Sequence, residues 1–290
     1  HFFKFLEQYK TLVHFNGDGF DIPFLLKRCK HFNLPYSFDN VASFDIYKKV
    51  KPYRNLLGLD SLKQKSIEQF LEISRTDKYN GGQLIEVYKD YLMTHEEGLY
   101  DLLILHNEDD LKGMPSILPI LNYPDLLEHA FTLKEQQIVD ESLADGQIRH
   151  LLKLTCQSPY SIPVPVQAAM PPARCRIEQD QVTFFVELTE GTLKHFYLDY
   201  KDYYYLPFED RAVHKSIGAC VDKEARIKAT ASNCYTKTTG FFLPQFEAIW
   251  EPVMKQEYKD KMLYAALGDV YLADEAALQK YIKAILSYLK

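Results

Sequence analysis

The segment HFNGDGFDIPFL, residues 14–25, joins an apolar stretch to a tight turn that carries two aspartates. Residues 11–15, where the apolar stretch ends, predict a buried strand. Asn16 and the glycines after it suit backbone with positive φ. Pro23 fits the first turn of a following helix, where a missing N–H costs little. The segment therefore predicts a strand, a turn and a helix, and it puts Asp21 near the carboxyl end of the strand, the edge at which α/β sheets bind ligands.

A second acidic segment, HNEDDLKGM, occupies residues 106–114. We expect it to lie in a helix over residues 96–113, with His106 and Asp110 on one face because they are four positions apart. Such a pair could hold a metal through the carboxylate while the imidazole handles a proton. Two carboxylates that converge from distant parts of a chain are what a divalent-metal phosphodiester chemistry needs.

Each acid also has a simpler interpretation when it is taken alone. Asp21 suits the N-terminus of a helix, where it interacts with the helix dipole. The pair of His106 and Asp110 suits a solvated helix face. Asp18 is most simply a turn acid, and Asp45 fits a structural role better than support of a ligand.

Bulk composition limits the classes of function. The chain has 290 residues and a net charge of −6, so its whole surface does not attract nucleic acid, and a polyanion would need a local basic patch. The five cysteines form no CxxC pair, which predicts reduced structural thiols of a cytoplasmic protein without zinc. No apolar run approaches the ~20 residues of a membrane span, and the start of the chain lacks the order of a signal peptide.

The remaining pattern divides the chain into three regions. Residues 1–122 alternate helix and strand and predict an α/β domain, with a further strand over 41–47 and a helix over 62–71 that Asp60 or Ser61 can cap. Residues 123–172 predict a connection that is partly helical and then Pro-rich.

Residues 173–290 predict an α+β domain of unknown role, with antiparallel strands and terminal helices. Its strands over 181–188 and 193–200 alternate in polarity, and a hairpin turn over 189–192 is expected between them. A further strand is expected over 203–207. Residues 251–290 are expected to be helical, with an inner stripe that includes Tyr264, Leu267, Tyr281, Ile282, Ile285 and Leu289.

The two acidic segments resemble a known family. Asn16-Gly17-x-x-Phe20-Asp21-x-Pro23-Phe24-Leu25 resembles the second motif of the DEDD 3′–5′ exonucleases, which have the ribonuclease H-like fold, and is most similar to the YprB-type ribonuclease H-like family. His106-Asn107-x-x-Asp110, followed by Gly113, resembles the third motif. Residues 58–63 and 70–75 resemble the middle helix of that family and the loop after it. The resemblance covers residues 1–122.

The resemblance implies hydrolysis of phosphodiester bonds with two Mg²⁺ or Mn²⁺ ions. Asp21 and Asp110 would be catalytic metal ligands. His106 would take the place of the Tyr or His that orients the attacking water. Asn16 would steady the turn, with Phe20 packed beneath it.

The chain departs from the family pattern in two ways. The opening Asp-x-Glu motif is absent, and the only acid before the second motif is Glu7, inside the first expected helix. We therefore expect an N-terminally incomplete chain whose own activity is in doubt. His106 stands at the spacing of the family's Tyr subtype, which favours an orienting role over that of a direct general base.

Substrate contacts are expected from basic side chains interleaved with Tyr47 and Tyr53, a mixture that suits the backbone and bases of a single-stranded end. These side chains lie between the two motifs and are Lys48, Lys49, Lys51, Arg54 and Lys63. Asn16 and Phe20 are further candidates for substrate contact. A second basic stretch over 215–237 could extend the groove. Either set could equally be an ordinary solvated surface.

The sequence thus predicts a metal-dependent nuclease, of the 3′–5′ exonuclease type, that acts on nucleic acid in the cytoplasm and has no membrane partner. The alternative is a non-catalytic nucleic-acid-binding or scaffold protein with a degenerate nuclease fold. A third possibility is a metal-free hydrolase that uses Asp21 and Asp110 as acid and base.

Overall fold

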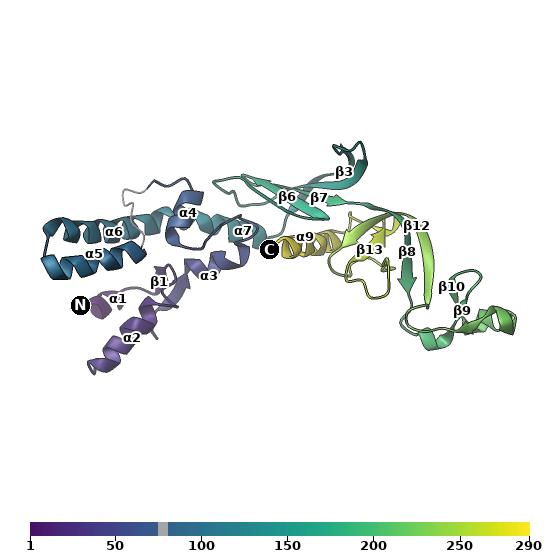
Figure 1. The fold of residues 1–290 in the computed structure, drawn as a ribbon, viewed down its shortest axis with the longest axis horizontal. Helices are drawn as coiled ribbons and strands as arrows, with labels where there is room; N and C mark the ends of the chain where they lie inside the picture. The colour runs from purple at the N-terminus through teal and green to yellow at the C-terminus, as the bar shows by residue number, and fades with distance from the viewer. Residues whose placement is uncertain (75–80) are drawn as a thin grey trace.

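A computed structural model describes residues 1–74 and 81–290 (Figure 1). The molecule is elongated, with the N-terminal helices at one end and strands β9 and β10 at the other (Figure 1). Helices α5 (Gly81–Thr94) and α6 (Glu97–Ser116) pack side by side at the N-terminal end, and α6 lies close to its predicted range. Among the residues described, no helix has both the length and the apolar character that crossing a membrane requires.

The predicted strand, turn and helix are present at the N-terminus. Helix α1 (Phe2–Leu6) precedes β1 (Thr11–His14), and α2 (Asp21–His31) follows the turn. Strand β1 pairs in parallel with β2 (Ala42–Asp45), and the register sets His14 opposite Asp45. The carboxyl ends of both strands therefore meet at one edge, as parallel pairing requires.

The next helical elements form part of the hydrophobic core against which this strand edge packs. The helices α3 (Ile46–Val50) and η1 (Lys51–Tyr53) follow β2 directly. Three later elements contribute to the same core, and these are α4 (Gln64–Phe70), η2 (Leu118–Leu121) and α7 (Asn122–Glu128). The expected cap of α4 by Asp60 or Ser61 is wrong: the helix starts after Lys63 without a side-chain cap, and the Ser61 hydroxyl contacts the Ser66 hydroxyl instead.

Residues 123–172 differ from the expected helical connection. Only α7 is helical there, and the strands β3 (Thr132–Ser142), β4 (Ile148–Gln157) and β5 (Val166–Met170) follow. The physical reason is a hairpin whose turn contains Gly146 at a φ of +85°, together with apolar residues of β4 that pair with β7. With β6 (Ala173–Glu178) and β7 (Gln181–Glu187) they form an antiparallel sheet in the order β3-β4-β7-β6-β5.

The expected hairpin between β7 and the following strand is also wrong. Residues 189–192 are part of β8 (Thr189–Phe196), which pairs with β12 (Tyr235–Gln245) in another sheet. Leu188, which links β7 to β8 in the chain, is buried. The chain therefore passes from one sheet to the other where a turn was expected. Local alternation of polarity predicts a strand but does not say which strand it will pair with.

The C-terminal region completes the fold. Strand β13 (Leu263–Ala266) joins β12, and the predicted strand near residue 203 is β9 (Tyr203–Leu206), which pairs with β10 (Arg211–His214) and β11 (Ile227–Lys228). The short helices of this region are η3 (Tyr200–Asp202), α8 (Lys215–Gly218), η4 (Lys223–Ala225) and η5 (Leu267–Asp269).

Residues 251–290 are helical only at their end. Helix α9 (Glu275–Leu289) begins at Asp274, whose carboxylate accepts hydrogen bonds from the Ala276 and Ala277 N–H groups. Tyr264 and Leu267 of the expected helical stripe instead lie in β13 and η5, because the chain first completes a strand of the β12 sheet.

One hydrophobic core runs from α3 to α9, with Tyr123, Phe184 and Tyr281 fully buried within it. The Asn55 side-chain amide donates to the main-chain carbonyl of Lys290 at 2.8 Å. The C-terminal helix therefore helps to hold the helices that support the N-terminal strand edge.

Candidate functional site

Asp21 and Asp110 line the same pocket, whose volume is about 630 Å³. The carboxylates come from the first turn of α2 and from the middle of α6. The pocket is lined by Phe15, Asn16, Phe20, Asp21, Tyr47, Arg54, Ser61, Leu62, Lys63, Gln64 and Asp110. Two acids that are distant in the chain thus line one pocket, together with the cationic residues Arg54 and Lys63.

The turn before α2 directs Asp21 toward this pocket. Asn16 adopts a φ of +58°, and its N–H donates to Oδ1 of Asp45 at 2.8 Å. The N–H of Gly17 donates to Nδ1 of His14 at 3.0 Å, and a Cβ on Gly17 would stand 2.7 Å from that nitrogen, so only glycine fits there. The expectation that Phe20 packs beneath the turn is wrong, because its side chain is 69% exposed at the pocket wall.

Asp110 is held by contacts between α6 and α4. The Gln64 side-chain amide donates to the main-chain oxygen of Asp110 at 3.0 Å and to Oε1 of Glu68 at 2.9 Å. Gly113, one turn later, is buried against α4, where an added Cβ would collide with Oε1 of Glu68. The glycine after the third motif therefore allows the close approach of two helices that positions Asp110.

His106 lies on the same helix face as Asp110, as the spacing predicts, with Nε2 at 3.4 Å from Oδ2 of that carboxylate. His106 is not among the described residues that line the pocket. The geometry fits an imidazole that contacts the Asp110 carboxylate from outside the pocket better than one that lies inside the pocket. Arg75, which the resemblance also included, lies outside the described residues.

Only two of the five expected basic side chains, Arg54 and Lys63, line the pocket. The Arg54 guanidinium donates to the main-chain oxygens of Leu59 and Asp60, which fixes its position. The ammonium groups of Lys49 and Lys51 lie over aromatic rings, and Lys48 forms an ion pair with Asp18.

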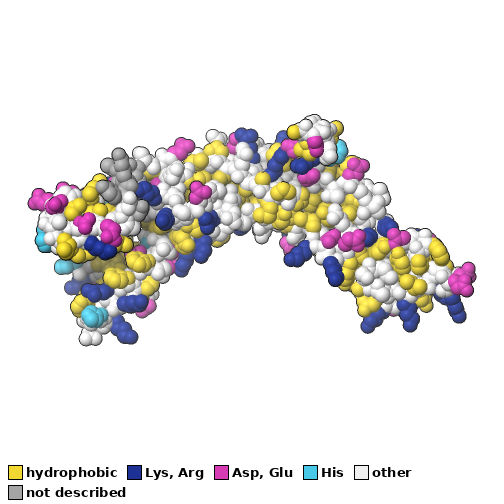
Figure 2. All heavy atoms as spheres, in the orientation of Figure 1, with side chains coloured by type: hydrophobic (Ala, Val, Ile, Leu, Met, Phe, Trp, Pro, Cys, Tyr) yellow, Lys and Arg dark blue, Asp and Glu magenta, His cyan; other side chains and the backbone are white. Residues whose placement is uncertain are grey.

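The second basic stretch lies at the other end of the molecule. It belongs to the region of β9 and β10, while the pocket is lined by the turn after β1 and by α2, α3, α4 and α6 (Figure 1). Figure 2 shows Lys and Arg side chains along the lower edge of that distant end. This stretch therefore does not extend the pocket.

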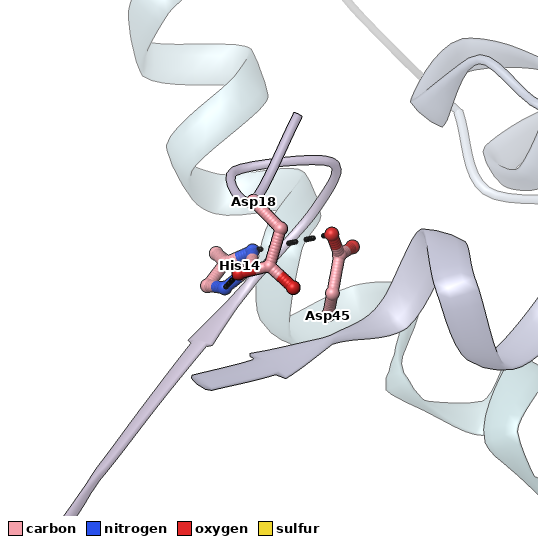
Figure 3. Close-up of side chains that lie close together, drawn as sticks. All are labelled: His14, Asp18 and Asp45. Atoms are coloured by element: carbon pink, nitrogen blue, oxygen red, sulfur yellow. Dashed lines mark ion pairs between the residues drawn. The ribbon is translucent and has the colours of Figure 1, made fainter. Parts of the chain in front are cut away.

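The structure also brings together three residues that the sequence did not assign to a site. His14, Asp18 and Asp45 each offer a possible ligand atom, and these atoms lie within 4.8 Å of one another (Figure 3). His14 and Asp45 end neighbouring parallel strands, and Asp18 comes from the turn. The signal that could have found them is the parallel pairing, which sets the last residues of the two strands side by side.

Hydrogen bonds favour the ionised form of Asp18. The Lys48 ammonium, 2.6 Å from Oδ2 of Asp18, and then the Ser43 hydroxyl lower the pKa of the Asp18 carboxyl. The same contact raises the pKa of Lys48. Asp18 is therefore ionised and already has one cation beside it.

Comparison with known proteins gives one finding for the N-terminal region. Residues 1–122 match the family model described as the RNase H superfamily. No curated protein and no solved structure matches the chain. The match has the range that the two acidic motifs predicted, and it contains the strand edge, α2 and α6. Residues 1–122 are therefore similar to the RNase H superfamily.

Proposed function

We propose that the protein is a divalent-metal-dependent nuclease of the YprB type that removes nucleotides from the 3′ end of single-stranded nucleic acid, and that residues 1–122 carry the chemistry. The observation that carries this proposal is the shared pocket of Asp21 and Asp110. A pocket with two carboxylates, two cations and the exposed ring of Phe20 suits a phosphodiester better than a neutral ligand.

The donor set fits Mg²⁺ or Mn²⁺, because both ions prefer carboxylate oxygens. Asp21 and Asp110 would hold the ions, which supply an activated water and stabilise the charge on the phosphate. The resemblance implies further acids from a motif that residues 1–290 do not contain.

Other pocket residues would bind and orient the substrate. Lys63 and Arg54 present positive charge to the phosphates. Phe20, exposed at the wall, offers a face on which a terminal base can stack. His106 holds the Asp110 carboxylate from the side, and we assign it the role of orienting the attacking water through that carboxylate. The free state of all five cysteines fits the cytoplasmic location that we propose.

The test is cleavage of a 5′-labelled single strand by residues 1–290 and by the longest natural chain that contains them. We expect products shortened from the 3′ end with Mg²⁺ or Mn²⁺, and none with a chelator. Asp21→Asn and Asp110→Asn should each reduce the rate about 100-fold or more, because each removes a charge from the ion site. Asp101→Asn, an exposed acid on the same helix as Asp110, is the matched control and should retain full activity.

Other outcomes contradict the proposal. Salt-sensitive binding without turnover by the longest natural chain favours the non-catalytic alternative. Cleavage that survives a strong chelator favours a metal-free hydrolase. Undiminished cleavage in both asparagine variants removes Asp21 and Asp110 from the chemistry.

A further inference from the structure

The carboxyl edge of β1 and β2 carries a group of residues that do not line the pocket. We infer that His14, Asp18 and Asp45 bind one divalent transition-metal ion, at a site separate from Asp21 and Asp110 (Figure 3). The inference does not depend on the proposed nuclease activity, because it rests on the contacts of these three side chains alone.

The first argument is a buried carboxylate oxygen of Asp45. The residue is 5% exposed, and its Oδ1 accepts hydrogen bonds from the N–H groups of Asn16 and Tyr47. Its Oδ2 is buried and has no hydrogen-bond partner in residues 1–74 and 81–290. Removing such an oxygen from water is costly unless a cation compensates it. This oxygen faces the His14 ring (Figure 3).

The second argument is the spacing of the possible ligand atoms. Oδ2 of Asp45 lies 3.9 Å from Nδ1 of His14, and Oδ1 of Asp18 lies 3.4 Å from Nε2. A four-coordinate ion with bonds of about 2.0–2.2 Å holds neighbouring ligand atoms about 3.3–3.6 Å apart. The 3.9 Å gap between Nδ1 and Oδ2 is close to that span, so a small rearrangement would let one ion bridge it, and one ligand atom from each of the three residues lies within 4.8 Å of the others.

The third argument is the state of the imidazole. Nδ1 of His14 accepts a hydrogen bond from Gly17 N–H, so it is the unprotonated ring nitrogen, and it lies 3.9 Å from Oδ2 of Asp45. Nε2 lies 2.7 Å from the Ser43 hydroxyl, which itself donates to Asp18. Metal-binding histidines are commonly oriented by a hydrogen bond at the other ring nitrogen. An ion at Nδ1 would replace only the contact with Gly17.

The fourth argument concerns charge. Two carboxylates lie beside His14, and the Lys48 ammonium pairs with one of them, that of Asp18, at 2.6 Å. The Lys48 side chain is 62% exposed, so it can leave Asp18 for solvent when a divalent ion arrives. One imidazole with two carboxylates suits Zn²⁺ or Mn²⁺ better than Mg²⁺, which prefers oxygen ligands and keeps its waters.

The test is calorimetric titration with Zn²⁺ of a chain that carries Asp21→Asn and Asp110→Asn, which removes the pocket acids. We expect one equivalent to bind, and excess Mg²⁺ not to displace it. His14→Gln and Asp18→Asn, added singly, should each weaken binding at least about 10-fold. Lys48→Met should strengthen it, because the competing ammonium is gone. Asp39→Asn, an exposed acid outside the group, should change nothing.

Absence of Zn²⁺ binding, or binding that neither His14→Gln nor Asp18→Asn weakens, would overturn the inference. Circular dichroism with a chelator present checks that each variant is folded. If His14→Gln does not fold, Asp18→Asn decides, since its side chain lies in a surface turn. Asp45→Asn is not used for the decision, because Asp45 also caps α3. The readout is binding and not cleavage, so its failure leaves the nuclease proposal to its own test.

Discussion

Replacement of Gly113 by alanine tests how α6 is held against α4. The added Cβ would collide with Oε1 of Glu68 and would stand 2.8 Å from Nε2 of Gln64. Overpacking of this kind costs about 1–3 kcal/mol, and disturbance of the hydrogen bond between Gln64 and the buried Glu68 costs about 1 kcal/mol more. The higher helix propensity of alanine offsets about 1 kcal/mol of this loss in the free energy of unfolding. We therefore expect a net loss of about 2 kcal/mol in the free energy of unfolding.

Gly98→Ala is the matched control, because Gly98 lies in the same helix and a Cβ there would meet nothing within 4 Å. It should stabilise the chain by about 0.5–1 kcal/mol. The assay is urea unfolding of both variants, followed by far-ultraviolet circular dichroism, with the midpoints compared at equal slope. Equal stability of the two variants, or a more stable Gly113→Ala, would refute the close approach that positions Asp110.

Three further predictions concern other parts of the chain. Hydrogen bonds, first that from Lys237, hold the pKa of Asp210 well below its usual value, so its contribution to stability is present above about pH 4 and is lost as the pH falls through the lowered pKa. Asp210→Asn should therefore destabilise the protein at pH 7, and thermal unfolding should show the difference shrinking below about pH 4. Gln245→Leu should cost about 3 kcal/mol in urea unfolding, because the buried side chain donates to two carbonyls and accepts from two N–H groups. Lys63→Ala should reduce the slope of the logarithm of the single-strand binding constant against the logarithm of salt concentration by about 1, measured by fluorescence anisotropy. Lys89→Ala, on α5, should leave that slope unchanged.

The parts of the fold that the sequence predicts best are those that local chemistry decides. Asn16 and the following glycines specify a turn whatever surrounds them, and Pro23 marks the first turn of a helix. The spacing of His106 and Asp110 likewise decides that they share a helix face. These features correctly predict that Asp21 lies in the first turn of α2 and that Asp110 lies within α6.

The parts that were missed depend on pairing between distant strands. Residues 189–192 look like a turn locally, but they pair with β12, which lies more than forty residues later in the chain. The polar strand β3 is held by β4 and has little apolar pattern of its own. The group of His14, Asp18 and Asp45 needs the parallel register of β1 and β2 before it exists. Register of this kind is a property of the assembled sheet.

The most direct test of the central claim is anomalous diffraction from crystals of the chain soaked in Mn²⁺. We predict a peak in the pocket, bound by the carboxylates of Asp21 and Asp110 either directly, at about 2.1–2.3 Å, or through an ordered water. The peak should disappear in crystals of Asp110→Asn. A pocket without Mn²⁺, or a peak within the pocket that persists in Asp110→Asn, would contradict the assignment of these two acids to one ion site.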